Sequence, residues 1–337
     1  MTKCKCRLYK SGNWGVKLSR PSTVCLKHYY LSPCYAIQFA LGFPGNLLVV
    51  FGYIFCLPKW ESINVYLFNL AVSDLIFLCT LPRLSYLYAN DQSESSPYLC
   101  IVNRYILHVN LYSSILFMVW VSVDRLLRVR YPSCQHFLLG SQGVAGQCRG
   151  LSWALVNLQV APLVVLMVHD QQQGNWTSCQ DFGSLRSEHS VLAYSLVAHA
   201  ERGYLLPLLG LLFSSLCIAR SLLRAQQGAL ASSQPHSYRR PLRVVTAAAV
   251  VFLVLYTPYH VMRNIRIAST ELWEEPGACT GKYVESGYIL TRHAGLHAQP
   301  SSTPLFYFLM GDRFRELLWA KLRGLGRRMG LDRVYGP

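Results

Sequence analysis

The sequence has 337 residues, of which 52% are hydrophobic and only 14% are charged, and its formal net charge is +16. A typical soluble domain has about 25% charged residues, so this composition cannot cover the surface of a soluble protein of this length. A nucleic-acid-binding protein is also excluded, because the basic residues lie between long apolar runs rather than in one solvated patch. The surplus apolar surface is therefore expected to face lipid.

Seven apolar runs are long enough to cross a membrane, whose core of about 30 Å needs about 20 helical residues. The predicted fold class is an all-α membrane protein, a seven-transmembrane helix bundle with a short amphipathic eighth helix. The seventh run is the least apolar, because Arg292, His293 and Gln299 interrupt it. The runs are Leu31–Cys56, Asn64–Tyr88, Leu99–Val129, Leu151–Val168, Val191–Leu223, Leu242–Ile267 and Tyr283–Met310.

Two further segments flank the bundle, so the predicted organisation is a tail over 1–30, the bundle over 31–310 and a final segment over 311–337. The tail is basic and has no apolar core, so no cleavable signal peptide is expected. In the final segment Phe314, Leu317, Leu318 and Leu322 fall on one helical face, with basic residues opposite. This pattern predicts a helix in the membrane interface.

Arginine and lysine set the orientation, because loops rich in them stay in the cytoplasm. The loops after spans three and five and the segment after span seven are rich in arginine, whereas the opposite loops hold mainly acids. The amino-terminal tail disagrees, since it is basic and has no acid. The later segments outweigh it, and the predicted location is the plasma membrane with an extracellular amino terminus.

Features of the segments predicted to be extracellular agree with this orientation. Asn175-Trp176-Thr177, between spans four and five, is a glycosylation acceptor triplet. Cys100 opens span three and Cys179 lies in the same loop as Asn175, so a disulfide in an oxidising compartment is expected, two free cysteines being the alternative. Cys25 and Cys279 are candidates for a second bridge, for which Cys4 and Cys6 compete.

Asp74 is a carboxylate in the middle of span two with no adjacent base. A charge at the centre of a bilayer costs about 2.5–3.5 kcal/mol on insertion scales, so this residue needs a polar partner or a cation. Asn46 and Ser114 are predicted at similar depth. A bound sodium ion and a protonated, hydrogen-bonded carboxyl are both compatible with these residues.

Basic side chains gather in the outer halves of several spans: Arg83, Arg104, His108, Arg263, Arg266 and Arg292. Guanidinium groups that face inward would form a cup for a small anion, because each binds a carboxylate or phosphate through two parallel hydrogen bonds. The alternative is that each arginine reaches outward to lipid headgroups or water. That alternative applies best to Arg83 and Arg266, near the ends of their spans, and we favour a site at Arg104, Arg263 and Arg292.

No catalytic motif accompanies this cup. His-Glu-x-x-His, Gly-x-Ser-x-Gly and paired intramembrane aspartates do not occur in the sequence. The sequence also shows no repeated pore-lining charges of the kind that a channel needs. The protein is expected not to be an enzyme.

Several spaced motifs resemble those of rhodopsin-like G-protein-coupled receptors. They are Gly45-Asn46, Leu70-Ala71-Val72-Ser73-Asp74, Asp124-Arg125, Trp153, Pro207 and Pro258. Within that family the chain is most similar to receptors for succinate, which stand near receptors for oxoglutarate and nucleotides. The similarity runs from about Tyr29 to Glu316 and is carried by Asn103-Arg104-Tyr105, Leu107-His108 and Thr257-Pro258-Tyr259-His260-Val261-Met262-Arg263-Asn264.

The resemblance implies specific roles. Arg104, His108, Arg263 and Arg292 would bind the two carboxylates of a four-carbon diacid, with Arg266, Tyr35 and Tyr86 as further candidates. Asp74, with Asn46 and Ser114, would hold an allosteric sodium ion. A heterotrimeric G protein would be the main partner, beside arrestin and membrane lipids. Residues that would couple the ligand to the G protein are Asp124, Arg125, Tyr307, Phe252, Pro207 and Ile115.

Four features depart from the family pattern. Leu126 follows Asp124-Arg125 where a tyrosine is common, Ser215 stands where a tyrosine is usual, and Thr303 replaces an asparagine before Pro304. The chain is also one residue longer between Arg292 and Pro304. Three hypotheses stay open: a dicarboxylate receptor, a receptor for a nucleotide, oxoglutarate or anionic lipid, and a non-signalling seven-helix binding protein.

Overall fold

A computed structural model describes residues 26–57, 60–92, 94–131, 142–172, 190–227, 236–271, 278–310, 317–321 and 323–324. Within these ranges every regular element is helical, and the predicted seven-span fold is confirmed. The spans are, in chain order, α2 (Ser32–Phe55), α3 (Ser62–Leu78) with α4 (Leu81–Ala89), α5 (Pro97–Arg130), α6 (Gln142–Gln172), α7 (Ser190–Gln227), α8 (His236–Glu271), and α9 (Ala278–Arg292) with α10 (Gln299–Met310).

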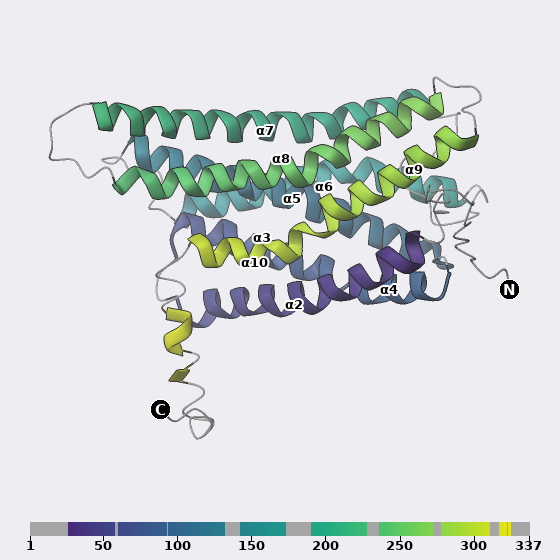
Figure 1. The fold of residues 1–337 in the computed structure, drawn as a ribbon, viewed down its shortest axis with the longest axis horizontal. Helices are drawn as coiled ribbons and strands as arrows, with labels where there is room; N and C mark the ends of the chain where they lie inside the picture. The colour runs from purple at the N-terminus through teal and green to yellow at the C-terminus, as the bar shows by residue number, and fades with distance from the viewer. Residues whose placement is uncertain are drawn as a thin grey trace, which may run out of the picture.

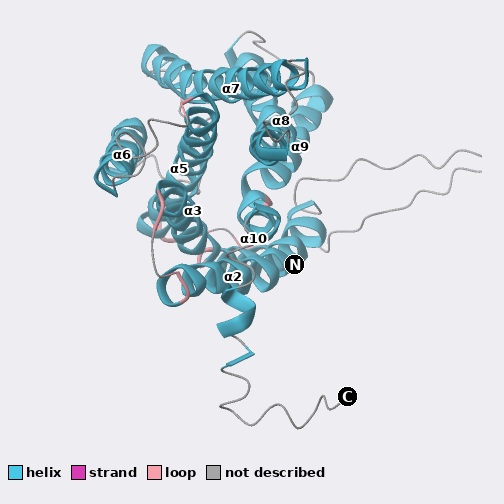
Figure 2. Cartoon of the chain, turned by 90° about the vertical axis from the view of Figure 1, so that its left-hand side faces the viewer, coloured by secondary structure: helices cyan, strands magenta, loops and turns pink. Residues whose placement is uncertain are grey.

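The helices run side by side with alternating direction, as Figure 1 shows. Seen along its length, the bundle is a ring of α2, α3, α5, α7, α8 and α10, and α6 lies outside the ring beside α5 (Figure 2). We call the end that holds Ala89 and Pro97 the outer end, and the end that holds Arg130 and Gln142 the inner end. Six of the described helical spans are long and apolar enough to cross a membrane.

Span two is broken into α3 and α4 at Cys79 and Thr80. Pro82 causes the break, because a proline donates no backbone hydrogen bond and its ring clashes with the carbonyl four residues earlier. The Thr80 hydroxyl compensates in part by donating to the Phe77 carbonyl at 2.7 Å. The sequence run predicted one continuous helix here.

Span seven is continuous but changes its winding. A π-helical turn, η6 (His293–His297), joins α9 to α10 and precedes Pro304. A π turn accommodates one extra residue inside an α-helix. The π turn therefore accommodates the additional residue counted between Arg292 and Pro304. The polar lower half of the span is helical up to Met310.

Spans six and seven approach closely at this turn. A side chain at Gly295 would place its Cβ against the Leu255 carbonyl oxygen, inside any allowed contact distance, so only glycine fits. This backbone contact fixes α8 against η6. Ser301 of α10 also bonds to the Gln38 carbonyl of α2 at 3.1 Å.

The buried core has two parts. The larger one contains Tyr35, Ile115, Phe252 and Tyr288, and it joins α2, α5, α8 and α9 in the outer and middle bundle. The smaller one joins α2, α3, α5 and α6 at the inner end and includes Leu318. Residues 317–321 are helical, which agrees with the predicted final helix; Leu318 is buried and Leu317 is partly exposed. Phe314 and Leu322 lie outside the described residues.

Candidate ligand-binding site

Groups from three other helices lie near the buried carboxylate of Asp74. Asn110 of α5 donates to its carboxylate at 2.9 Å. Gln299 of α10 and Tyr256 of α8 also lie within electrostatic range of the same carboxylate. The three residues therefore lie around the Asp74 carboxylate.

Arg104, Arg263 and Arg292 lie outward of these three residues by similar numbers of positions along their helices. Arg104 precedes Asn110 by six residues, Arg263 follows Tyr256 by seven, and Arg292 precedes Gln299 by seven. At a helical rise of about 1.5 Å per residue, Arg104 lies about 9 Å along α5 from Asn110, and Arg263 lies about 10 Å along α8 from Tyr256. The separation on span seven crosses the π turn η6. The three guanidinium-bearing residues thus lie on three spans, each six or seven residues outward of a residue that lies near Asp74.

The cup residues are also withdrawn from solvent. Arg263 is 6% exposed and His108 is 4% exposed, while Arg104 and Arg292 are half-buried. The His108 ring is held by its Nδ1, which lies 2.7 Å from the Arg104 carbonyl oxygen. Buried cations of like sign favour a bound anion strongly, because the interior screens charge poorly.

An aromatic layer supports the cup on the side of α8 and α9. The Arg263 guanidinium lies 5.7 Å from the centre of the Tyr259 ring. Tyr259 packs on Tyr288, and His260 stacks on Tyr204 with ring centres 4.1 Å apart. Rings below a guanidinium keep its hydrogen-bonding edge available for a planar carboxylate.

Arg266 has a different environment from Arg263. Its Nε lies 2.8 Å from the Glu285 Oε2 across the gap between α8 and α9. Its guanidinium also lies 4.6 Å from the centre of the Tyr288 ring. The structure therefore pairs this candidate ligand residue with an acid of the protein.

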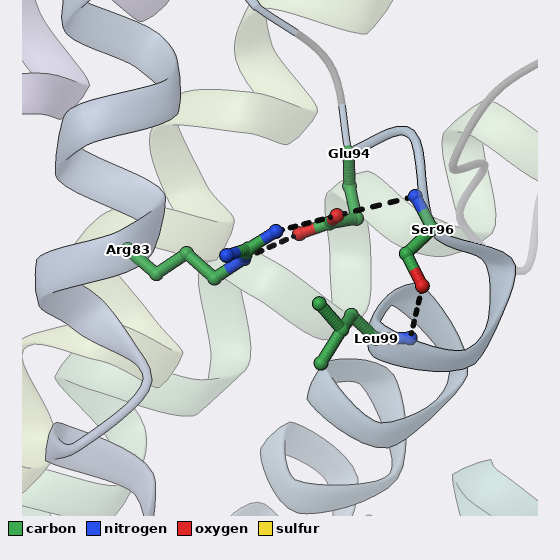
Figure 3. Close-up of polar contacts among 4 residues, drawn as sticks. All are labelled: Arg83, Glu94, Ser96 and Leu99. Carbon is green, nitrogen blue, oxygen red and sulfur yellow. Dashed lines mark hydrogen bonds and ion pairs between the residues drawn. The ribbon is translucent and has the colours of Figure 1, made fainter.

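Arg83 binds Glu94, as Figure 3 shows. Two parallel hydrogen bonds of 2.8 and 2.9 Å join the guanidinium to the carboxylate. The Glu94 carboxylate also accepts from the Ser96 amide, and the Ser96 hydroxyl caps α5 by accepting from the Leu99 amide. Hydrogen bonding to Arg83 lowers the pKa of Glu94 below its ordinary value of 4.5. The Arg83–Glu94 ion pair therefore joins span two to the segment that leads into span three, and we call it the Arg83–Glu94 clamp.

The two candidate tyrosines differ. Tyr35 is 2% exposed and packs against Tyr88 and His293, close to the π turn. Tyr86 is 63% exposed on α4, so the structure does not bring it to the buried residues. Tyr88, which sequence reasoning missed, follows Tyr86 on the same helix by a half-turn and faces inward.

The candidate sodium site is partly assembled. Within the described residues, the Asp74 Oδ2 and the Ser114 hydroxyl are buried without a hydrogen-bond partner, and Ser114 lies near the carboxylate. Hard cations prefer such oxygen ligands, so the residues fit a sodium ion. The Asn46 amide instead donates to the carbonyls of Gly42 and Pro300. Asn110, one turn before Ser114 on the same face, was missed by the sequence reasoning.

The inner end carries a charged cluster. Asp124 is 1% exposed, its Oδ2 lies 2.9 Å from the Arg128 Nε, and the Arg125 Nε is 3.8 Å away. Arg128 also reaches Glu61, the residue before α3, at 3.3 Å. Arg128 was not singled out from the sequence, although its spacing of four residues from Asp124 is the spacing of helical ion pairs.

The residues between the two ends are packed. Ile115 and Phe252 are fully buried in one core cluster, Pro207 is buried on α7, and Phe252 stacks on Tyr204. Tyr307 lies in α10, and its side chain is outside the described set.

Two of the residues that depart from the family pattern have hydroxyl groups that form hydrogen bonds within their own helix. Ser215 donates to the Leu211 carbonyl and Thr303 to the Gln299 carbonyl. The Thr303 hydroxyl also lies near the Asp74 carboxylate, so this substitution keeps a polar group at the candidate sodium site. Leu126 lies half-buried on α5.

Of the outer cysteines, Cys100 is disulfide-bonded. The predicted partner Cys179, the candidate Cys25 and the glycosylation candidate Asn175 lie outside the described residues, as does the side chain of Cys279. Among described residues, the free thiols are Cys34, Cys56, Cys79, Cys148 and Cys217.

Comparison with known proteins identifies the family. The family described as "7 transmembrane receptor (rhodopsin family)" matches residues 45–284. The chain is 44% identical to succinate receptor 1 of Mus musculus over 299 residues, which cover 88% of this chain and 92% of the mouse protein. It is also 44% identical to succinate receptor 1 of Rattus norvegicus, over 88% of this chain and 92% of the rat protein.

More distant similarity extends to a purinoceptor. The chain is 31% identical to purinoceptor 1 of Cavia porcellus over 303 residues, which cover 89% of this chain and 79% of that protein. Proteins of this family bind a small-molecule ligand and couple to a G protein, and they are not enzymes. The chain therefore belongs to the rhodopsin family of G-protein-coupled receptors, which cross the plasma membrane several times.

Proposed function

We propose that this receptor senses an extracellular small dicarboxylate, with succinate as the ligand, through Arg104, His108, Arg263 and Arg292. The observation that carries the proposal is the matching outward position of these residues on three spans, with Arg263 and His108 buried and Arg104 and Arg292 half-buried. Relatives named for succinate cover nearly the same length of chain at 44% identity.

The chemistry favours a diacid over a monoacid. Guanidiniums on α5, α8 and α9 approach the ligand from different sides, so one carboxylate cannot satisfy all three in bidentate geometry. A ligand with a carboxylate at each end can bind Arg104 and His108 at one end and Arg263 and Arg292 at the other. A chain of a few carbons would separate the two carboxylates.

Signalling follows from bridging three spans. A diacid that binds α5, α8 and α9 stabilises the arrangement in which their outer ends are closest, and the ligand shifts the population by its preference for that arrangement. The close backbone contact at Gly295 and the buried Phe252 and Ile115 carry the displacement inward. At the inner end, the G protein would meet Arg125.

A sodium ion at Asp74 is proposed as an allosteric ligand. Asp74, Ser114 and Asn110 would hold it, and Thr303 lies near the same carboxylate. The ion would supply a positive charge to a buried carboxylate that otherwise has the amide of Asn110 and neutral hydroxyls around it.

The remaining proposals concern orientation and partners. We place the amino terminus outside the cell, which puts Asn175 and a Cys100–Cys179 bridge in an oxidising compartment. Arrestin and membrane lipids are proposed as further partners at the arginine-rich inner end.

The test is the calcium and cyclic-AMP response of cells that express this chain to graded succinate, malate, oxoglutarate and a nucleoside diphosphate. A saturable response led by succinate supports the proposal. A response led by the nucleotide would assign the arginines to a phosphate ligand instead. Binding of succinate at the surface without any response would make the chain a binding protein and implicate Leu126, Ser215 and Thr303.

A further inference from the structure

The mouth of the cup holds an acid that no expectation from the sequence included. Glu285 lies on α9 one turn before Tyr288 and two turns before Arg292, so it stands outward of the cup on the same helix. Its carboxylate pairs with Arg266 at 2.8 Å. Arg266 in turn follows Arg263 by three residues on α8, which places the two arginines on one face.

The Arg266–Glu285 pair is connected to the cup through the rings of Tyr288 and Tyr259. Arg266 is only 15% exposed and covers the Tyr288 ring, Tyr288 packs on Tyr259, and Arg263 covers Tyr259. A chain of contacts thus leads from the Glu285 carboxylate to a buried cup arginine. An anion that extended outward from Arg263 would meet Arg266 next.

We propose that Glu285 is a specificity-determining residue: it is a tethered carboxylate that occupies Arg266 and so closes the cup to longer or more highly charged acids. This inference rests on the proposed function. In this arrangement the protein's own carboxylate takes the place that a third ligand carboxylate would fill. Discrimination by an unfavourable charge at the boundary of a site is a common route to specificity.

Two consequences distinguish this role from that of a simple ligand residue. Arg266 is engaged by Glu285, so Arg266→Gln should cost succinate little potency, about threefold at most for a partly exposed pair. Removal of the Glu285 charge should release Arg266 for ligands that reach it. Glutarate, adipate and citrate are suitable probes, because each extends beyond succinate or adds a carboxylate.

The experiment compares Glu285→Gln with the wild-type receptor for potency of succinate, glutarate, adipate and citrate. We expect the longer acids and citrate to gain about tenfold relative to succinate, since a released guanidinium forms a charge-assisted contact. The double variant Glu285→Gln/Arg266→Gln should lose this relative gain. Asp91→Asn is the matched control, because it removes an exposed outer carboxylate that pairs with His28 and not with Arg266.

Equal shifts for all acids in Glu285→Gln would overturn the proposal, because they would reflect only the change in overall charge. Persistence of the gain in the double variant would overturn it as well. The same panel is measured as thermal stabilisation of the purified proteins. If the wild type signals to succinate and the selectivity of Glu285→Gln is unchanged, the inference fails and the proposed function stands; if no acid stabilises or activates the wild type, the proposed function fails with it.

Discussion

Asp124 is held more closely by Arg128, one turn along α5, than by its neighbour Arg125. The Arg128 Nε lies 2.9 Å from the Asp124 Oδ2, whereas the Arg125 Nε lies 3.8 Å from it. Arg128 also reaches Glu61, the residue before α3. The buried carboxylate at the inner end thus has two cationic neighbours, and the one that the family motif does not include is the nearer.

Loss of Arg128 should tighten the contact between Asp124 and Arg125. Because Asp124 is 1% exposed, its charge then depends on Arg125 alone, and Arg125 becomes less available to the G protein. Arg128→Ala is expected to lower ligand-driven G-protein activation about fivefold, the equivalent of roughly 1 kcal/mol. Nucleotide exchange on the purified receptor measures this.

Arg130→Ala serves as the control for that variant, because Arg130 is an exposed residue of the same helix end. Arg128→Lys should recover part of the activation, as it keeps the charge. A rise in activity without ligand in Arg128→Ala would contradict the account, since it would mean that Arg128 restrains the inactive form.

The Arg83–Glu94 clamp should make stability depend on acidity. The folded-state pKa of Glu94 lies below 4.5, so its contribution is complete above pH 4.5 and is lost as the pH falls through the lower folded value. The melting temperature of Glu94→Gln should therefore lie below that of the wild type at neutral pH, and the gap should close on acidification. Arg83→Gln should show the same convergence. A gap that is constant over this range would rule out the clamp as its source.

The π turn should tolerate removal of one residue and not addition of one. Deletion of exposed Ala294 converts η6 to regular α-helix and leaves Arg292 in phase with α10, because the turn holds one extra residue. Insertion of an alanine after Ala294 rotates Arg292 by about 100°. Potency of succinate should survive the deletion and be lost on insertion, at matched surface expression. The opposite pattern would show that the π turn itself positions Arg292.

Sodium should stabilise the receptor through Asp74. A ligand at ten times its dissociation constant adds about 1.4 kcal/mol to the stability of the form that binds it. Thermal unfolding of the purified protein in sodium chloride and in choline chloride, at equal ionic strength, measures this effect. Asp74→Asn and Ser114→Ala should lose the difference; an equal sodium effect in Asp74→Asn would place the ion elsewhere.

The spans could be predicted from the sequence because hydrophobic length and arginine distribution are properties of single segments. The basic residues Arg104, His108, Arg263 and Arg292 are likewise read from single segments, whereas their role as one site stays a prediction. Pro82 could have predicted the break in span two, but the apolar run around it favoured one continuous helix.

The pairings were not predictable in the same way. Whether Arg83 meets Glu94, and Arg266 meets Glu285, depends on the rotation of helices and the path of a short loop, which the sequence pattern leaves open. Asn110 was overlooked for the same reason, because its contact with Asp74 requires the phase of α5 relative to α3. The extra residue before Pro304 could be counted in the sequence. That a π turn accommodates it became clear only from the three-dimensional contacts of Gly295.

The most direct test of the central claim is the succinate dose–response of Arg292→Ala beside the wild type and Arg83→Gln, with surface expression measured for each. Loss of a partner from a buried charge pair costs at least about 2 kcal/mol, so potency in Arg292→Ala should fall by about 30-fold or more. Arg83→Gln, whose partner is Glu94, should keep wild-type potency. An unaltered curve for Arg292→Ala at normal expression would contradict the assigned cup.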